Sequence, residues 1–322
     1  MEAYIAKKLP IDYDLDKELL KLISEANEKY GEYKALLNND EFDAKLFLDS
    51  IVLNESLKSS QIEGTRISQD EMYYLKYTLK NDDSMEIQNL KNAIDYASYK
   101  LATGEDINML LVNQMHSILL QSVRGENKEP GKIRTIQNWI GQAGSTINDA
   151  EFIPPRPEEI HKLLENLFKY MNDKFIDPIF VNLAISHYQF ETIHPFLDGN
   201  GRTGRLLIIL YLISTGLLNK PVLYISDFFE RNRMSYYDSL SMVKQTDNIT
   251  QWLKFFLNGI IETSKNSIKT FDEIIKLRKE VETKLTTIGK KARNGQKLIE
   301  MLYSTPKVNA KMVSEQLKIS IV

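Results

Sequence analysis

The chain contains no cysteine, and only four histidines and two tryptophans occur among its 322 residues. The lack of cysteine excludes disulfides, cysteine nucleophiles and thiolate metal sites, and it is consistent with a reducing, cytoplasmic location. Long hydrophobic runs are also missing, because the longest, Leu206 to Ile213, is far too short to span a bilayer. No apolar segment follows residues 1–7, so we expect neither a signal peptide nor a membrane partner.

Charge is distributed unevenly along the chain, although the net charge of −3 indicates no particular partner. Residues 263–322 hold 13 Lys and Arg against 6 Asp and Glu, a local balance of +7, which leaves the rest of the chain near −10. A basic tail is typical of nucleic-acid binding, and it is equally typical of a solvated, lysine-rich helix face. Both interpretations stay open on charge alone.

Helical periodicity dominates the sequence. Apolar residues at three- and four-residue steps predict helices over residues 19–37, 44–63, 86–101, 106–123, 158–172, 178–193, 202–215, 252–261 and 264–288. Gly64 is expected to follow the second helix, and Ser68 with Glu71 forms a capping box that starts another. Asp177 before Pro178 is expected to be an N-cap.

One long stretch, residues 125–157, interrupts this helical pattern and is rich in glycine and proline. Within it, residues 133–140 have the character of a strand, so the stretch predicts a long loop or hairpin. Loops of this length usually serve a function. We call residues 125–157 the flap.

The most informative segment covers residues 193–205 and reads IHPFLDGNGRTGR. Pro195 should end a helix just after His194, and Gly199 and Gly201 allow a tight backbone turn. The next helix is expected to begin near Arg202, and its free N–H groups would form an anion site in the loop.

Side chains of the same segment supply the remaining chemistry. Arg202 and Arg205 lie three residues apart, on one side of the helix, where they can bind phosphates. Asp198 is a hard oxygen ligand suited to Mg²⁺, and His194 has the pKa of a general base. Separately these residues are ordinary, but together they predict a nucleotide polyphosphate site with a metal and a base. The sequence contains no Walker A loop and no dinucleotide-binding glycine motif on a strand–helix unit.

Residues 194–205 match the pattern H-P-F-x-D-G-N-G-R-x-x-R at every defined position, and the chain therefore resembles the Fic family. The resemblance implies a mainly α fold with a short β-hairpin flap and an enzyme that transfers AMP from ATP to Tyr, Thr or Ser hydroxyls of target proteins. Self-modification is expected, and the oligomeric state, including a homodimer, stays open. Some similar proteins transfer phosphocholine or UMP, so the nucleotide follows the commonest chemistry.

The resemblance also assigns roles to residues. It implies that His194 takes the hydroxyl proton and that Asp198 holds Mg²⁺. The α- and β-phosphates would bind the side chain of Asn200 and the backbone of residues 199–204, and the outer phosphates would bind two arginines. The nucleotide-binding residues are thus Gly199, Asn200, Gly201, Arg202, Thr203, Gly204 and Arg205.

Neighbouring residues agree with this resemblance. His187, two helical turns before His194, is expected to be buried and hydrogen-bonded rather than a second base. The flap resembles the hairpin with which such proteins hold a target backbone, turning at Gly141 and Gln142. Tyr236 is assigned to the adenine pocket, with a place in the hydrophobic core as the alternative.

An inhibitory motif is recognisable upstream, where residues 59–64 read SSQIEG and resemble the family pattern [S/T]-x-x-x-E-[G/N]. Ser59 and Glu63 lie four residues apart on one helix face. A carboxylate at the helix end could form a bidentate pair with Arg205 and keep the γ-phosphate away. The alternative is an ordinary surface glutamate.

The end of the chain resembles the first two helices of a winged helix-turn-helix, over residues 296–302 and 309–317. The sequence stops at Val322, before a recognition helix and wing, so DNA binding is not expected. A nucleotide-sensing, DNA-binding transcriptional regulator is nevertheless the alternative to an enzyme. The predicted regions are an N-terminal helical region (1–103), a Fic catalytic domain (104–262), a helical linker (263–295) and a partial winged helix (296–322).

Overall fold

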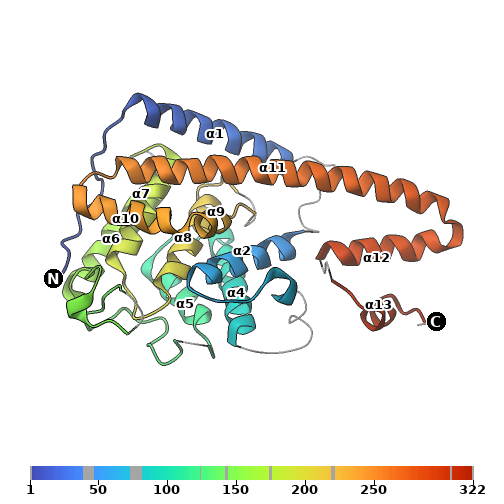
Figure 1. Ribbon diagram of the computed structural model, residues 1–322, viewed down its shortest axis with the longest axis horizontal. Helices are drawn as coiled ribbons and strands as arrows, with labels where there is room; N and C mark the ends of the chain where they lie inside the picture. The colour runs from blue at the N-terminus through green and yellow to red at the C-terminus, as the bar shows by residue number, and fades with distance from the viewer. Residues whose placement is uncertain are drawn as a thin grey trace.

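The structure is a computed structural model that describes residues 2–38, 47–72, 82–123, 125–141, 144–173, 176–218, 222–304 and 307–320. These residues form a mainly helical fold (Figure 1). Its helices are α1 (Lys17–Leu37), α2 (Leu48–Ile62), α4 (Asp82–Ala102), α5 (Met109–Leu119), α6 (Pro157–Asn172), α7 (Ile179–Ile193), α8 (Asn200–Ser214), α9 (Ser226–Arg231), α10 (Arg233–Thr246), α11 (Thr250–Thr287), α12 (Ala292–Ser304) and α13 (Ala310–Leu317), with 3₁₀ turns at Ile147–Asp149 and Gly289–Lys291.

Helices α7 and α8 form the centre of the fold, because nearly every residue of both is buried. A helix that is apolar on all sides is stable only when other elements surround it. Helices α2, α4 and α5 pack on α8, and α6, α11 and α1 pack on α7. Within the described ranges no helix combines the length and apolarity needed to cross a bilayer. Because other helices pack around both α7 and α8, the loop that joins these two helices is held in place by its surroundings.

Helix α11 is longer than the sequence predicts. Two helices were expected over residues 252–261 and 264–288, but one continuous helix of 38 residues extends across both. In Figure 1 it lies beside α1, and its C-terminal half extends past the other helices before α12 turns back. The connection between α11 and α12 is short, because α12 already begins at Ala292.

The strand predicted at residues 133–140 is wrong. Among the described flap residues there is one isolated antiparallel bridge, between Ile140 and Phe152. A side chain occupies a main-chain acceptor that a longer ladder would use, since Gln137 Nε2 donates to the Pro154 carbonyl (2.9 Å). Pro154, Pro155 and Pro157, which follow Phe152 in the flap, also have no main-chain N–H to donate to such a ladder. Gln142, expected at the turn, lies outside the described residues.

The predicted helix boundaries near residue 64 agree with the structure, whereas the predicted cap at Asp177 is wrong. Helix α2 ends at Ile62 just before Gly64, and the Ser68 N–H donates to Glu71 Oε2 (2.9 Å) in a capping box. At α7 the N-cap is Pro178, because Asp177 instead accepts hydrogen bonds from two tyrosine hydroxyls, at 2.9 and 2.5 Å. Residues 44–46 of the second predicted helix are outside the described ranges.

The core position of Trp252 in α11 gives a prediction about stability. Its side chain is fully buried, and its Nε1–H donates to the Ala184 carbonyl of α7 (2.8 Å). We expect Trp252→Ala to lower the free energy of unfolding by about 3–5 kcal/mol, because it leaves a large cavity. Leu277→Ala on the same helix is the control: Leu277 is 60% exposed, so its change should stay within about 0.5 kcal/mol. Urea unfolding of both variants measures the difference, and equal losses would contradict a core role for Trp252.

Candidate active site

His194 lies where α7 ends, in the left-handed backbone region with φ 49°. Its Nδ1 is 3.3 Å from the Glu191 carbonyl oxygen. Because a carbonyl can only accept, Nδ1 carries the proton, and Nε2 is left as the basic nitrogen. The pKa of His194 is lowered to about 4, mainly by burial and in part by Lys244 and Arg134, while the Glu191 carbonyl and Glu63 act in the opposite direction. The imidazole is therefore a neutral base at physiological pH.

The turn between α7 and α8 is held by hydrogen bonds to its carbonyl groups. Arg134 Nε donates to the His194 carbonyl (2.9 Å), and the Arg134 main-chain N–H donates to the Pro195 carbonyl (2.9 Å). Asn200 bonds both the N–H and the carbonyl of Phe196, each at 2.8 Å. Thr203 Oγ1 donates to the Gly199 carbonyl (2.8 Å). The Asn200 and Thr203 side chains thus shape the loop, and the Thr203 N–H also donates to the Gly199 carbonyl (3.0 Å), so a phosphate contact is expected from the main-chain N–H of Asn200.

His116 of α5 supports the same turn from the opposite side. Its Nδ1 accepts from the Gly131 N–H (2.8 Å), so its Nε2 carries the proton and donates to the Asp198 carbonyl (2.8 Å). Burial lowers the pKa of His116 to about 4, and its ring stacks on Phe196 with centroids 3.7 Å apart. Gly199 follows with φ 74° as the N-cap of α8, and a Cβ there would lie 3.2 Å from His116 Nε2. Glycine is required by both the backbone angle and this close approach.

The predicted phosphate-binding arginines are both buried. Arg202 is 2% exposed and lies 3.7 Å from Glu86 and from Asp198, and its Nε and Nη1 have no hydrogen-bond partner among the described residues. Buried guanidinium donors without partners are costly unless a ligand or water uses them. Arg205 is 1% exposed and is fully engaged by α2. The two arginines thus differ, because Arg202 has guanidinium donors without partners among the described residues, whereas the Arg205 guanidinium is hydrogen-bonded to Ser59 and Glu63.

The occupant of Arg205 is the predicted inhibitory motif. Arg205 Nη2 donates to Glu63 Oε1 (2.7 Å), and Arg205 Nε donates to Ser59 Oγ (2.8 Å). The Glu63 carboxylate lies directly over the first turn of α8, since a Cβ on Gly201 would be 2.3 Å from Oε1. Burial would raise the pKa of Glu63, but Arg205 outweighs it and the pKa lies below its usual value. An anion from the chain itself therefore sits at the helix N-terminus, where an anion is stabilised.

A second carboxyl group, Glu191, lies beneath the site and was not anticipated from the sequence. Its Oε1 is buried and has no hydrogen-bond partner among the described residues, and a Cβ on Gly204 would lie 2.2 Å from it. Burial raises the pKa of Glu191 to about 7, with Arg205 opposing. Burial also lowers the pKa of the nearby Lys244 to about 8, with Glu191 opposing. Glu191 and Lys244 therefore form a titratable pair near His194.

His187 and Tyr236 form a buried hydrogen-bonded pair. His187 Nδ1 donates to the Gly204 carbonyl (3.1 Å), and its Nε2 accepts from the Tyr236 hydroxyl (2.9 Å). The structural role expected for His187 agrees with these contacts. Tyr236 is 1% exposed, so its position favours the core alternative, whereas its neighbour Tyr237 is 41% exposed. A contact of Tyr236 with adenine stays a prediction.

Asp198 is the one predicted metal ligand. Its Oδ1 accepts from the Gly199 N–H (2.6 Å), and its side chain is about a third exposed. No group of three or more acidic or histidine residues in the described ranges is arranged to hold a metal. Mg²⁺ is commonly bound by one or two carboxylates together with substrate phosphates, so Asp198 fits a shared ion rather than a cage made of protein alone.

Family models and known proteins match this chain over much of its length. A model of the Fic/DOC family matches residues 106–212, and a model described as Fic/DOC family N-terminal matches residues 20–99. The protein adenylyltransferase fic-1 of Caenorhabditis elegans is 30% identical over 191 residues, which is 58% of this chain and 33% of that protein. A probable protein adenylyltransferase of Aquifex aeolicus is 26% identical over 245 residues, 71% of this chain and 69% of the relative. This chain thus spans about a third of the nematode protein.

Solved structures agree on the fold. A Fic family protein from Desulfovibrio desulfuricans superposes with a TM-score of 0.68 at 19% identity, covering 96% of this chain and 86% of the other. A Fic domain containing signaling protein from Bacteroides thetaiotaomicron gives 0.63 at 20% identity, covering 77% and 97%. At these identities the likeness concerns the fold alone. With two family models that together span more than half of its residues, and with the helical fold of those structures, the chain belongs to the Fic/DOC family.

Proposed function

We propose that this chain is a protein adenylyltransferase, which transfers AMP from ATP to a Tyr, Thr or Ser hydroxyl of target proteins and of itself. The single observation that supports it best is a neutral base beside a ready anion site. His194 has a free Nε2, and the N-terminus of α8 already binds the Glu63 carboxylate through Arg205. Glu63 is also close enough to raise the pKa of His194. The names of the nematode and Aquifex relatives agree with this activity.

The proposed reaction uses His194 as a general base. Nε2 takes the proton of the acceptor hydroxyl as its oxygen attacks the α-phosphorus of ATP. The bond between the α-phosphorus and the bridging oxygen to the β-phosphate breaks, and pyrophosphate leaves with that electron pair. The proton on His194 then passes to solvent, which restores the neutral base.

The chain would hold the nucleotide by its phosphates. The N–H groups of the first turn of α8 face the site, and the unpartnered Nε and Nη1 of Arg202 offer further donors. Arg205 would hold the outer phosphate once Glu63 releases it. A Mg²⁺ ion, when bound by Asp198 and the phosphates, would offset negative charge on the departing pyrophosphate.

In this proposal Glu63 is a brake. Its carboxylate occupies Arg205 and the space over Gly201, where an outer phosphate would otherwise sit. ATP would then bind with its α-phosphate out of line with the incoming hydroxyl. The same carboxylate could instead orient a water for AMP removal, and the two roles predict opposite effects of losing it.

Removing the Glu63 carboxylate should raise the rate of AMP transfer. A hydrogen bond to a charged group is worth about 1.5–3 kcal/mol, or roughly 10- to 150-fold in the competent population. We expect a gain of this order for Glu63→Gly and for the isosteric Glu63→Gln. The initial rate of labelling from α-labelled ATP with Mg²⁺ measures it, and Glu273→Gln on exposed α11 is the control. A folded Glu63→Gly protein with an unchanged rate would exclude the brake, and a loss of AMP removal would favour the reverse reaction.

Loss of the base should separate chemistry from binding. In the Glu63→Gly background we expect His194→Ala to reduce transfer by about 10²- to 10⁴-fold, as for other general bases. ATP affinity should remain within a fewfold, because the phosphate-binding groups lie on α8. Transfer assays and calorimetric ATP binding provide the two readouts. Near-normal transfer by the folded His194→Ala protein would refute the assignment.

The protonation of His194 gives a prediction that is independent of activity. Burial, Lys244 and Arg134 disfavour its charged form, and its pKa is lowered to about 4. The ring should therefore remain neutral, with Nδ1 protonated, as the pH falls through 6, and it should protonate only near pH 4. Glu63→Gly should lower the midpoint further, because Glu63 acts in the opposite direction. Heteronuclear NMR of the imidazole measures this, and a midpoint near the ordinary value of about 6.5 would disprove it.

A further inference from the structure

Residues 2–16, which we call the N-terminal strap, cross the outside of the helical core without regular secondary structure. Side chains of two helices hold the strap by its main chain. Asn166 of α6 bonds both the N–H and the carbonyl of Leu9, at 2.7 and 3.0 Å. Gln189 of α7 donates to the Lys7 carbonyl (2.8 Å). These hydrogen bonds therefore fix the path of the strap between Lys7 and Leu9.

On the N-terminal side of Lys7, the strap reaches the flap. The Tyr4 N–H donates to the Ile153 carbonyl (2.9 Å), and the Tyr4 ring lies against Phe152 with centroids 5.5 Å apart. Phe152 is the residue that pairs with Ile140 in the flap's single bridge. Tyr4 thus contacts both the backbone and the side chain of the returning flap segment.

Lys244 of α10 contacts the same ring. Its ammonium lies 3.2 Å from the Phe152 ring centroid, and no hydrogen bond or ion pair of Lys244 is present among the described residues. A cation–π contact is stronger where water is excluded, and Lys244 is half-buried. Tyr4, Phe152 and Lys244 form a unit that we call the flap bracket.

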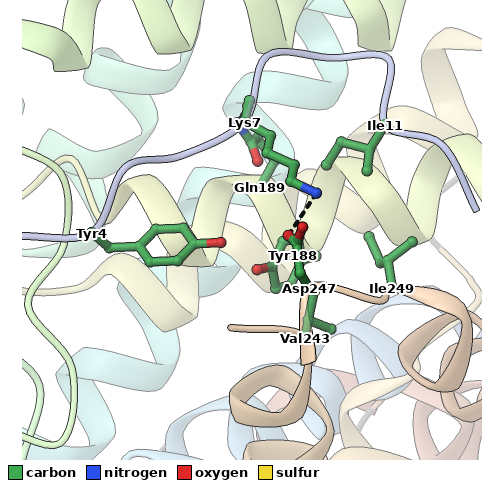
Figure 2. Close-up of a pocket in the computed structure, with 8 residues that line it drawn as sticks. All are labelled: Tyr4, Lys7, Ile11, Tyr188, Gln189, Val243, Asp247 and Ile249. Atoms are coloured by element: carbon green, nitrogen blue, oxygen red, sulfur yellow. Dashed lines mark hydrogen bonds and ion pairs between the residues drawn. The ribbon is translucent and has the colours of Figure 1, made fainter. Parts of the chain in front are cut away.

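The rest of the strap's contact with α7 and α10 is thin. Figure 2 shows Tyr4 beside Tyr188 and Lys7 above it. Lys7 forms an ion pair with Asp247, at 2.5 Å. Both members of that pair are largely exposed, so it contributes little. Between strap and helices lies a cavity of about 10 Å³, room for about one water. Tyr4 is therefore the main tie between this part of the strap and the flap.

The flap needs such a tie if it presents its edge to a target. A ladder reduced to one bridge has little stability of its own. The base of the flap is bonded to the catalytic turn through Arg134, but its tip at Gly141 is exposed. A shift of about 1 Å in an acceptor's position can cost about 100-fold in rate. A contact that holds Phe152 in place therefore also holds Ile140, because the two residues pair across the bridge.

We propose that Tyr4 is a positioning residue: through the flap bracket it holds the flap edge in register with His194, so that a protein acceptor is aligned. This inference rests on the proposed adenylyl transfer. The effect of Tyr4 concerns the acceptor alone, because neither Tyr4 nor Phe152 hydrogen-bonds Asp198, Arg202 or Arg205 among the described residues. Water needs no strand pairing, so release of free AMP from ATP should not depend on Tyr4.

The first measurement is amide hydrogen exchange, which requires no activity. The N–H groups of Ile140 and Phe152 both bond across the bridge, at 2.8 and 3.1 Å. Tyr4→Ala should speed their exchange about two- to tenfold, the range expected for loss of an aromatic pair. Tyr4→Phe keeps the ring and should leave exchange unchanged, as should Ile5→Ala, whose side chain is 81% exposed. Equal exchange in Tyr4→Ala and wild type would overturn the proposal.

The second measurement compares two acceptors in the Glu63→Gly background with α-labelled ATP: the chain itself, by incorporated label, and water, by released AMP. Tyr4→Ala should lower labelling of protein at least tenfold while AMP release stays within twofold, and Tyr4→Phe should restore labelling. Equal loss of both products, or no loss of labelling, would overturn the proposal. If Glu63→Gly with intact Tyr4 yields neither product, adenylyl transfer fails, and the exchange rates still decide the bracket.

Discussion

The site depends on one constraint, which is that the turn between two buried helices must satisfy its carbonyl groups while the first N–H groups of α8 stay unused. Arg134, His116 and Asn200 donate to the carbonyls of residues 194–198. The N–H groups at the start of α8 remain available, as they do at any helix N-terminus. Because the donors for these carbonyls are side chains of the flap, α5 and Asn200, anion binding at the main-chain N–H groups and loop rigidity do not compete for the same atoms.

This division explains why buried histidines surround the site in neutral form. His116 donates through Nε2 and His187 donates through Nδ1, each to a main-chain carbonyl, and burial lowers both pKa values, to about 4 and about 3. A protonated His116 ring would place a second donor against the Gly131 N–H, which can only donate. His194 shares the depressed pKa but differs in one respect, because its second nitrogen has no hydrogen-bond partner among the described residues. The same desolvation that makes two histidines structural leaves the third as a base.

Much of this site could be predicted from the sequence because its chemistry is local. The base, the glycines and both arginines lie within residues 194–205, so a turn followed by a helix fixes their arrangement. The contact between Glu63 and Arg205, 142 residues apart, was predictable only because the inhibitory motif is recognisable. His116, 82 residues from Asp198, and Arg134, 60 residues from His194, carry no comparable signal. A histidine on an amphipathic helix and an arginine in a loop acquire their roles only through tertiary packing.

The flap shows the limit of local reasoning in the other direction. Residues 133–140 have strand-like composition, but Arg134, Gln137 and Asn138 direct their side chains to main-chain carbonyls, and the described part of the flap has one isolated bridge. The main-chain N–H and the side chain of Arg134, together with the side chain of Asn138, attach the flap to the catalytic turn. A flap built in this way is rigid at its base and weak at its tip. Rigidity at the tip must therefore come from outside the flap, and among the described residues it is the strap and α10 that contact Phe152.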